Sequence, residues 1–283
     1  MKKTSSIREN GIKKDKWFIY LTFALAVLLM AGSGCGILME NTYALESASW
    51  RIQGIAQDVV DLFIIAPALI VSGIFTFHKK RIFVYIFGGT LLFIAYSYFF
   101  YCFAVHFNYL FLIYCFTLGL SVYSFIYLIV SLATCEIIKW YNNKVPAKTI
   151  GIYLLVIAAL FYIMWLSEIL PALIHNRAPE NIIQNGLLTN PVHVLDISLL
   201  LPAFIITAVL LMKKRSAGFL LAPTILVFCI LMNINIAALV IAMKLNEITD
   251  SLLVSWLMLA LALISISLLY IFLKHLNKKN EFQ

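Results

Sequence analysis

The chain alternates between long apolar runs and short polar segments. Eight runs have about 20 residues or more, and they cover residues 17–38, 58–77, 82–104, 109–135, 150–173, 194–212, 217–243 and 252–273. A helix needs about 20 mostly apolar residues to cross the hydrocarbon core of a bilayer. Backbone groups that face lipid must find their hydrogen-bond partners within the same segment, so such runs form helices. The pattern predicts an all-α, polytopic transmembrane bundle of eight helices.

The composition agrees with this fold class. Hydrophobic residues make up 63% of the 283 positions and charged residues only 12%, whereas a soluble domain carries about 25% charged residues. A globule of this length could not hide that much apolar surface from water. Membrane lipids are therefore the expected partners of most side chains. A cysteine follows small residues at Cys35, as in a lipoprotein signal, but the apolar run before it is too long for a usual signal peptide, and we expect the first helix to be retained.

The basic residues indicate how the bundle is oriented. Segments 1–16, 78–81, 136–149, 213–216 and 274–283 hold 18 of the 21 lysines and arginines. Because positively charged loops stay on the cytoplasmic side, both termini are expected to be cytoplasmic. These short loops and the anionic lipid headgroups near them account for the net charge of +8. We therefore expect no nucleic-acid partner.

Two stretches 135 positions apart resemble each other, "DVVDLFIIAPALIVSGIFTFHKKR" and "HVLDISLLLPAFIITAVLLMKKRS". Residues 59–91 align with 194–226 without a gap and are identical at seven positions. The match predicts a parallel 4+4 repeat, with the alternative that a common helix pattern recurs by chance. The first four helices would then occupy 17–138 and the last four 150–273, joined by a cytoplasmic linker at 139–149 and flanked by the terminal segments 1–16 and 274–283.

Each repeated stretch carries an aspartate at the head of its apolar run, Asp61 or Asp196. Such a residue at the head of a helix can cap unpaired backbone N–H groups. Asp58 lies three residues before Asp61, and His193 three before Asp196, so each pair shares a helix face. These faces could instead bind a proton or a cation. Both interpretations remain open at this point.

A proline follows each aspartate by six residues, at Pro67 and Pro202. Proline removes one N–H group and clashes with the carbonyl group four residues earlier. Both helices are therefore expected to kink, leaving the carbonyl groups of Phe63 and Ser198 without their usual partners. The kinks could open a polar niche or serve packing alone.

Further polar residues interrupt the apolar runs in what would be the outer half of the bundle. Glu168 lies within the fifth run, where a carboxylate is costly and is by default a functional hypothesis; it could also pair with His175 or Arg177. Tyr98 and Asn233 correspond under the 135-residue offset, and His106 lies just beyond the third run. We therefore predict a polar vestibule open to the outside, with Asp61, Asp196 and Glu168 binding a cation or proton and Tyr98 and Asn233 orienting a small-molecule ligand. The alternative is that these side chains only join helices by hydrogen bonds.

The sequence contains no H-E-x-x-H, G-x-S-x-G or glycine-rich phosphate-binding motif. His106, His175, His193, Asp196 and Glu168 are suitable metal-ligand types, but their spacing predicts no particular metal. The cofactor, the metal and any catalytic residue therefore stay unknown. A transporter or small-molecule binding protein is the favoured function. The alternatives are a membrane enzyme acting on a lipid-soluble substrate at the outer leaflet and a non-catalytic assembly or sensory subunit.

The segments "NPVHVLDISLLLPAFI", "KKRSAGFLLAP" and "AVHFNYLFLIY" resemble uncharacterised multi-pass membrane proteins of bacteria. The resemblance covers most of residues 57–230 and implies no activity, cofactor or site. It does imply a multi-pass protein of the bacterial inner (plasma) membrane, and the short loops and lysine-rich composition fit that location.

Overall fold

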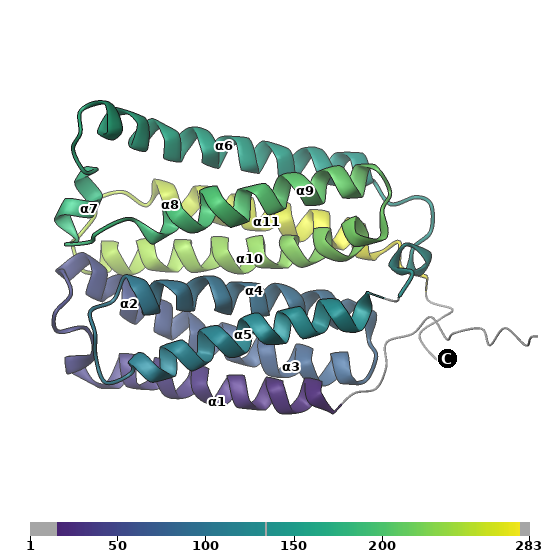
Figure 1. Ribbon diagram of the computed structural model, residues 1–283, viewed down its shortest axis with the longest axis horizontal. Helices are drawn as coiled ribbons and strands as arrows, with labels where there is room; N and C mark the ends of the chain where they lie inside the picture. Colours follow the sequence, from purple (N-terminus) through teal and green to yellow (C-terminus); the bar gives the residue numbers. More distant parts are fainter. Residues whose placement is uncertain (1–15, 134, 278–283) are drawn as a thin grey trace, which may run out of the picture.

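The chain folds into a bundle of helices whose axes all run roughly along one direction (Figure 1). The computed structural model describes residues 16–133 and 135–277, and these residues form no β-sheet. Eight helical spans in them are long and apolar enough to cross a membrane. Six of these spans are single helices: α1 (Trp17–Leu38), α4 (Arg81–Phe103), α5 (Phe111–Leu132), α6 (Ala147–Ile174), α10 (Ser216–Leu245) and α11 (Leu253–Leu273).

The remaining two spans are composite helices. In each composite span a π-helical turn lies between two α-helices. The first composite span consists of α2 (Ala48–Val60), η2 (Asp61–Ile65) and α3 (Ala66–Phe77). The second consists of α8 (Pro191–Leu195), η4 (Asp196–Leu200) and α9 (Leu201–Met212). Short helices in the connections are η1 (Glu40–Tyr43), η3 (Ile137–Trp140) and α7 (Glu180–Gln184).

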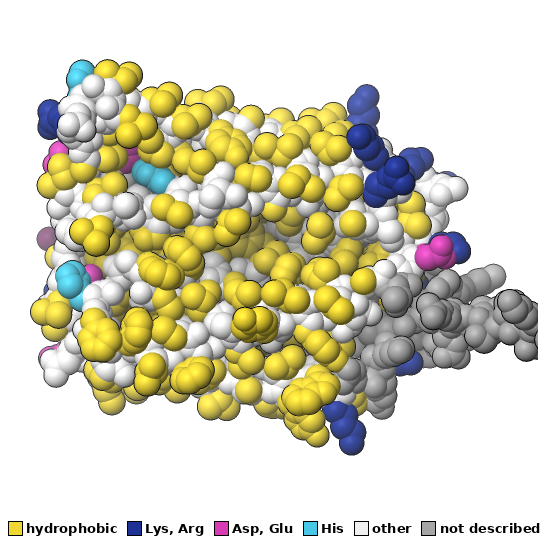
Figure 2. Space-filling model, viewed as in Figure 1, with side chains coloured by type: hydrophobic (Ala, Val, Ile, Leu, Met, Phe, Trp, Pro, Cys, Tyr) yellow, Lys and Arg dark blue, Asp and Glu magenta, His cyan; other side chains and the backbone are white. Residues whose placement is uncertain are grey.

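The outer faces of the helices carry large apolar side chains. Phe116 is 63% exposed and Tyr123 is 71% exposed, and hydrophobic side chains cover most of the visible surface between the two ends (Figure 2). Lysine and arginine side chains gather mainly at one end of this view, and histidine and acidic side chains mainly at the other. A surface this apolar is stable in lipid and not in water. The chain is an integral membrane protein.

We call the end that carries Lys79 and Lys214 the basic end and the opposite end, which is predicted to face outward, the outer end. The chain enters α1 and leaves α11 at the basic end (Figure 1). The predicted spans match the observed helices within about three residues, except for the second. That span begins at Ala48, ten residues before the predicted start, because Ser47 caps the helix by accepting a hydrogen bond from the Trp50 backbone N–H.

The interpretation that Asp61 and Asp196 cap their helices is wrong. Asp61 lies 13 residues into a continuous helical span, and the cap of the other span is Asn190, which accepts from the Val192 N–H at 2.9 Å. Each aspartate instead begins the π-helical turn, and its carbonyl group accepts from the N–H group five residues later. π turns are a recognised cause of helix kinks. Each turn lies just before the proline, Pro67 or Pro202, that removes a regular helical hydrogen bond.

The backbone repeats locally at the 135-residue offset. The two π turns correspond residue for residue, as do α3 and α9, and α4 and α10 begin at corresponding positions. Between them, Lys79 (φ 61°) and Lys214 (φ 52°) both adopt the left-handed conformation. The two stretches therefore share their irregularities as well as their helices.

We call residues 17–132 the first half and residues 147–273 the second half. In Figure 1, α4 and α10 lie side by side at the centre, with α1, α3 and α5 on one side and α6, α9 and α11 on the other. Gly89 of α4 allows this close approach, because a Cβ atom there would lie 2.5 Å from Val227 and 2.8 Å from the Thr224 carbonyl oxygen of α10. The helix α2 also packs on α10, so the first half reaches across the interface near the outer end.

Candidate functional site: a cavity between the two halves

A cavity of about 460 Å³ lies between the two halves. Its walls come mainly from α2 and α4 of the first half and from α6, α8, η4, α9, α10 and α11 of the second, with Tyr43 of η1 and Val105 beyond α4 also lining it. No residue of α1, α3 or α5 lines it. Cavities of 300–1,000 Å³ are typical of small-molecule sites. Figure 2 shows the molecular surface hollowed between the two groups of helices, with hydrophobic side chains around the hollow.

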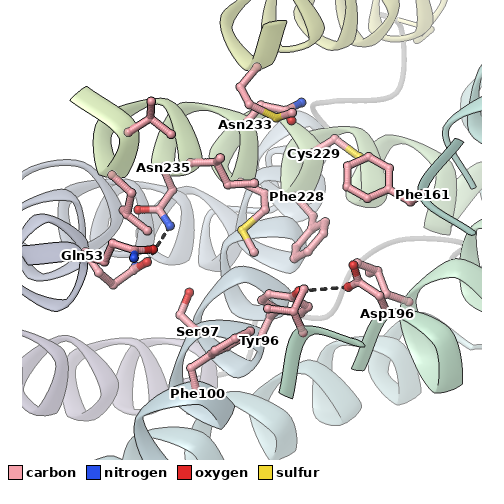
Figure 3. A pocket seen from close by; sticks show the side chains of 18 of the residues that line it. Gln53, Tyr96, Ser97, Phe100, Phe161, Asp196, Phe228, Cys229, Asn233 and Asn235 are labelled. Atoms are coloured by element: carbon pink, nitrogen blue, oxygen red, sulfur yellow. Dashed lines mark hydrogen bonds between the residues drawn. The ribbon is translucent and has the colours of Figure 1, made fainter. Parts of the chain in front are cut away.

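The lining is largely apolar and rich in aromatic rings. The rings belong to Tyr43, Trp50, Tyr96, Phe100, Tyr101, Tyr153, Phe161, Trp165, Phe204 and Phe228. A few polar side chains converge among them: Gln53, Gln57, Ser97, Asp196, Asn233 and Asn235 (Figure 3). An apolar cavity with a few placed polar groups is the usual form of a site that orients a mostly apolar ligand.

Asp196 is the only carboxylate that lines the cavity among the described residues. The π turn η4 places it there, 3% exposed. Its Oδ1 accepts a hydrogen bond from the Tyr96 hydroxyl at 2.9 Å (Figure 3). Its Oδ2 accepts one from the Trp165 Nε1–H at 2.8 Å. Both oxygens thus have hydrogen-bond donors. No basic side chain of the described residues forms an ion pair with it.

Asp61 lies behind the cavity wall rather than in it. It is fully buried, and its Oδ1 accepts from Gln57 Nε2 at 2.9 Å. The Gln57 Oε1 accepts in turn from Asn235 Nδ2 at 2.5 Å, so one glutamine joins α2 to α10. The Asp61 Oδ2 and the Asn235 Oδ1 have no hydrogen-bond partner among the described residues. Gln57 and Asn235 line the cavity, and Gln57 separates Asp61 from it.

Asp58 lies within the first half and is 1% exposed. The Tyr43 hydroxyl donates to its Oδ2 at 2.5 Å, and the Tyr101 hydroxyl donates to its Oδ1 at 2.8 Å. Burial, and then the neighbouring Asp58 carboxylate, raise the pKa of Tyr43 well above its usual range, so this hydroxyl keeps its proton. Gly36 leaves room for the carboxylate, because a Cβ atom at that position would overlap it.

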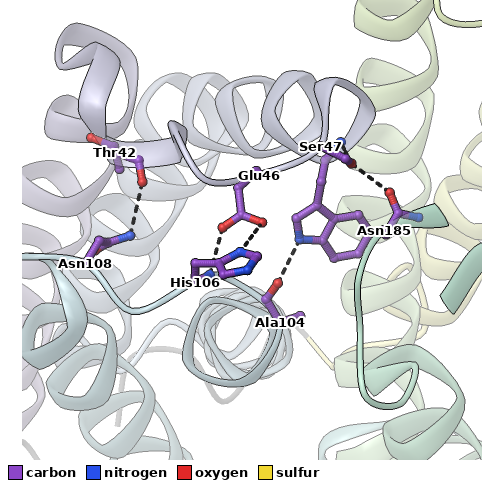
Figure 4. Close-up of polar contacts among 8 residues, drawn as sticks. Thr42, Glu46, Ser47, Ala104, His106, Asn108 and Asn185 are labelled. Atoms are coloured by element: carbon purple, nitrogen blue, oxygen red, sulfur yellow. Dashed lines mark hydrogen bonds and ion pairs between the residues drawn. The ribbon is translucent and has the colours of Figure 1, made fainter. Parts of the chain in front are cut away.

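Three other predicted residues lie outside the cavity near the outer end. His193 is 6% exposed, its Nε2 lies 3.5 Å from the Glu168 Oε2, and its ring packs on Trp165 with centroids 4.7 Å apart. Glu168 borders a separate shallow groove with His175 and Arg177. His106 contacts Glu46 through both its ring and its backbone N–H, at 3.1 and 2.7 Å (Figure 4).

The two outer connections meet near the same end. The Ser47 hydroxyl donates to Asn185 Oδ1 at 2.9 Å, and Trp50 Nε1–H donates to the Ala104 carbonyl at 2.9 Å (Figure 4). Much of the segment 39–57, which lies between the first two predicted spans, is the helix α2, and this helix supplies part of the cavity wall. The connection 174–193 joins it through Asn185.

The structure thus brings together only part of the predicted set. Asp196 and Asn233 line the cavity, and Asp61 lies one residue behind its wall. Asp58 and Tyr98 are buried within the first half, where the Tyr98 ring packs against Tyr101 and Tyr114. The acids Asp61, Asp196 and Glu168 do not face one common space.

The sequence reasoning missed several residues of the cavity. Gln53, Gln57, Tyr96 and Trp165 supply polar groups or hydrogen bonds there. A signal for two of them was present, because Trp50, Gln53, Gln57 and Asp61 recur every three or four residues and so form a polar stripe on a helix. The predicted start of the second span at residue 58 left most of this stripe outside the helix. Nothing in the sequence marked Tyr96 or Trp165 as partners of Asp196, which lies 100 and 31 positions away.

Among the described residues, no group of three or more His, Cys, Asp or Glu side chains could hold a metal ion. The ligand types noted in the sequence are divided between the His193–Glu168 pair, the His106–Glu46 pair and the hydrogen-bonded Asp196.

The fold and the site define an eight-span helical membrane protein with an interhelical, aromatic cavity that contains one carboxylate. No protein-family model matches the chain, and no curated protein or solved structure shows significant similarity to it.

Proposed function

We propose that this protein binds a small, mostly apolar organic cation in the cavity between its halves and carries it across the membrane. The observation that carries the proposal is the cavity itself, about 460 Å³ in volume, with an aromatic lining and the single lining carboxylate of Asp196. The wall supplies an apolar surface for the body of the ligand. The carboxylate and the polar side chains supply its orientation.

The charge of the ligand follows from the surroundings of Asp196. Its oxygens accept two protein hydrogen bonds, and no cationic side chain of the described residues neutralises it. A negative charge in a low-dielectric cavity attracts a cation strongly and repels an anion. Aromatic rings such as Tyr96 and Trp165 add cation–π attraction at their faces. An amine or quaternary cation with an apolar body therefore fits both features.

The two halves suggest how the ligand would move. The shared π turns and left-handed turns at the 135-residue offset support a duplication of a four-helix unit. Parallel repeats of this kind occur in transporters, with the binding site where the repeats meet. We propose that the halves rock about the α4–α10 contact to open the cavity to either side, in the bacterial plasma membrane and with both termini in the cytoplasm.

Binding of a lipophilic cation tests the proposal. Radiolabelled tetraphenylphosphonium is equilibrated with the full chain in nanodiscs, and empty nanodiscs correct for partition into lipid. We expect saturable binding of one cation per chain, and at least tenfold weaker binding by Met232→Trp, because Met232 lines the cavity and the larger ring fills it.

Met30→Trp is the matched control, since Met30 is 38% exposed on α1 and does not line the cavity. It is expected to bind like the unmodified chain. Tetraphenylborate, which has nearly the same shape and the opposite charge, is expected to show no saturable binding. Binding that is equal for both ions, or unaffected by Met232→Trp, would contradict the proposal.

A further inference from the structure

The three buried aspartates of the bundle differ in their hydrogen-bond donors. Asp58 accepts from two tyrosine hydroxyls, and Asp196 accepts from a tyrosine hydroxyl and a tryptophan N–H. Asp61 is the most deeply buried of the three, yet it accepts a single bond from the neutral amide of Gln57, and its Oδ2 has no partner among the described residues. A buried oxygen without a donor is far more costly on a carboxylate than on a neutral carboxyl group.

No positive charge compensates Asp61 from the elements packed around it. Its electrostatic neighbours are Asp58 on α2 and Tyr98 and Tyr101 on α4, all of which are neutral or negative. The helices α1 and α3 contain no Asp, Glu, His, Lys or Arg. The only such residue of α10 is Lys244, at its outer end, 3.8 Å from Asp250. The basic residues of α2 and α4, Arg51 and Arg81, lie at helix ends, Arg81 over the Trp140 ring.

We propose that Asp61 is a proton-binding site, protonated at neutral pH, which exchanges its proton with the cavity past Gln57 and Asn235. The proton resides on Oδ2, the oxygen without a donor, while Oδ1 accepts from Gln57. Because Gln57 lines the cavity on one side and touches Asp61 on the other, displacement of its amide connects the carboxyl group to cavity water. Gln57 is a positioning residue in this arrangement.

A bound sodium ion is the alternative way to satisfy a buried carboxylate, but the geometry favours the proton. The amide nitrogen of Gln57 is a hydrogen-bond donor and not a metal ligand, and it lies 2.9 Å from the Asp61 Oδ1. Sodium prefers a shell of several oxygen ligands, whereas a proton needs only the one lone pair that Oδ2 offers. The inference uses the cavity of the proposed function only as the route of exchange, and it does not depend on which ligand the cavity binds.

Infrared spectroscopy of the full chain in lipid vesicles tests the site directly. At neutral pH we expect the C=O stretching band of one protonated carboxyl group per chain, shifted on transfer to D₂O. The band is expected to disappear in Asp61→Asn and to persist in the matched variants Asp58→Asn and Asp196→Asn. Asp61→Asn keeps the neutral state proposed for the resting protein, so it is expected to fold.

Two further variants test the positioning and the route. Gln57→Leu removes the donor to Oδ1 and is expected to shift the band to higher frequency without abolishing it. Met232→Trp, which fills the cavity, is expected to slow the D₂O-induced shift at least tenfold, whereas Met30→Trp is expected to leave its rate unchanged.

The proposal is overturned if the unmodified chain shows no such band, if the band survives Asp61→Asn, or if it appears only when sodium is replaced by choline. An exchange rate that Met232→Trp leaves unchanged overturns the route through the cavity. None of these readings requires tetraphenylphosphonium to bind, so a failure of the proposed transport function and a failure of the proton site are separate results.

Discussion

Asp196→Asn is expected to weaken tetraphenylphosphonium binding by ten- to a hundredfold. A unit charge about 6 Å from the carboxylate, at an effective dielectric constant of about 20, is attracted by about 3 kcal/mol, and every 1.4 kcal/mol is roughly a factor of ten in affinity. Part of this attraction is offset because the Asp196 carboxylate loses solvent when the cation binds beside it. The expected loss of affinity therefore extends down to tenfold. Equilibrium binding in nanodiscs measures the change.

Glu168→Gln is the matched control for this variant. It also removes one negative charge near the outer end, but Glu168 borders the shallow groove and pairs with His193 instead of lining the cavity. We expect its affinity for the cation to stay within about twofold, since Glu168 is partly open to solvent, where salt screens its charge. Equal losses in both variants would show that the cation responds to the general charge of the outer end and not to the cavity.

Gly89→Ala is expected to lower the free energy of unfolding by about 1–3 kcal/mol, the usual cost of overpacking a tight contact. The new methyl group would lie 2.5 Å from the Val227 side chain and 2.8 Å from the Thr224 carbonyl oxygen, so α4 and α10 would have to separate. Thermal unfolding followed by circular dichroism in detergent is expected to show a melting temperature lower by several degrees.

Gly119→Ala provides the comparison. Gly119 lies within α5, and a Cβ atom there meets no heavy atom within 4 Å. Alanine is favoured over glycine inside a helix by roughly 0.5–1 kcal/mol, so this variant is expected to be as stable as the unmodified chain or slightly more so. A loss of stability equal to that of Gly89→Ala would mean that the close approach of α4 and α10 does not hold the halves together.

The bundle was predictable because the apolar content of each span indicates by itself that the span lies in lipid. A helix in lipid satisfies its backbone by itself, so length and apolar content alone identified the eight spans. The second span was predicted too short because the prediction used only length and apolar content. Its first turns carry Gln53 and Gln57, which face the interior cavity, and average hydropathy cannot distinguish a polar residue facing a cavity from one in a loop.

The candidate site was only partly predictable. An intramembrane aspartate is conspicuous in any sequence, so Asp61 and Asp196 were found, and the 135-residue offset paired them. Their equivalence in the sequence does not extend to their surroundings. Asp196 accepts hydrogen bonds from Tyr96 of the first half and from Trp165 of the second half. Asp61 accepts one from the amide of Gln57, which lies four residues earlier in the same span.

The sequence by itself determined that this protein lies in lipid, where its helices run and which end of the bundle is basic, because these follow from local composition. It also determined where two helices become irregular, because proline disturbs a helix wherever it stands. Only the tertiary structure decided which buried acid faces the cavity, which one is held by tyrosines and which one has an oxygen without a donor. Those differences depend on side chains that come from spans distant in the chain. Gln57 and Asn235, for example, form a hydrogen bond although 178 positions separate them. No local pattern encodes such a contact, because it arises only when the helices pack.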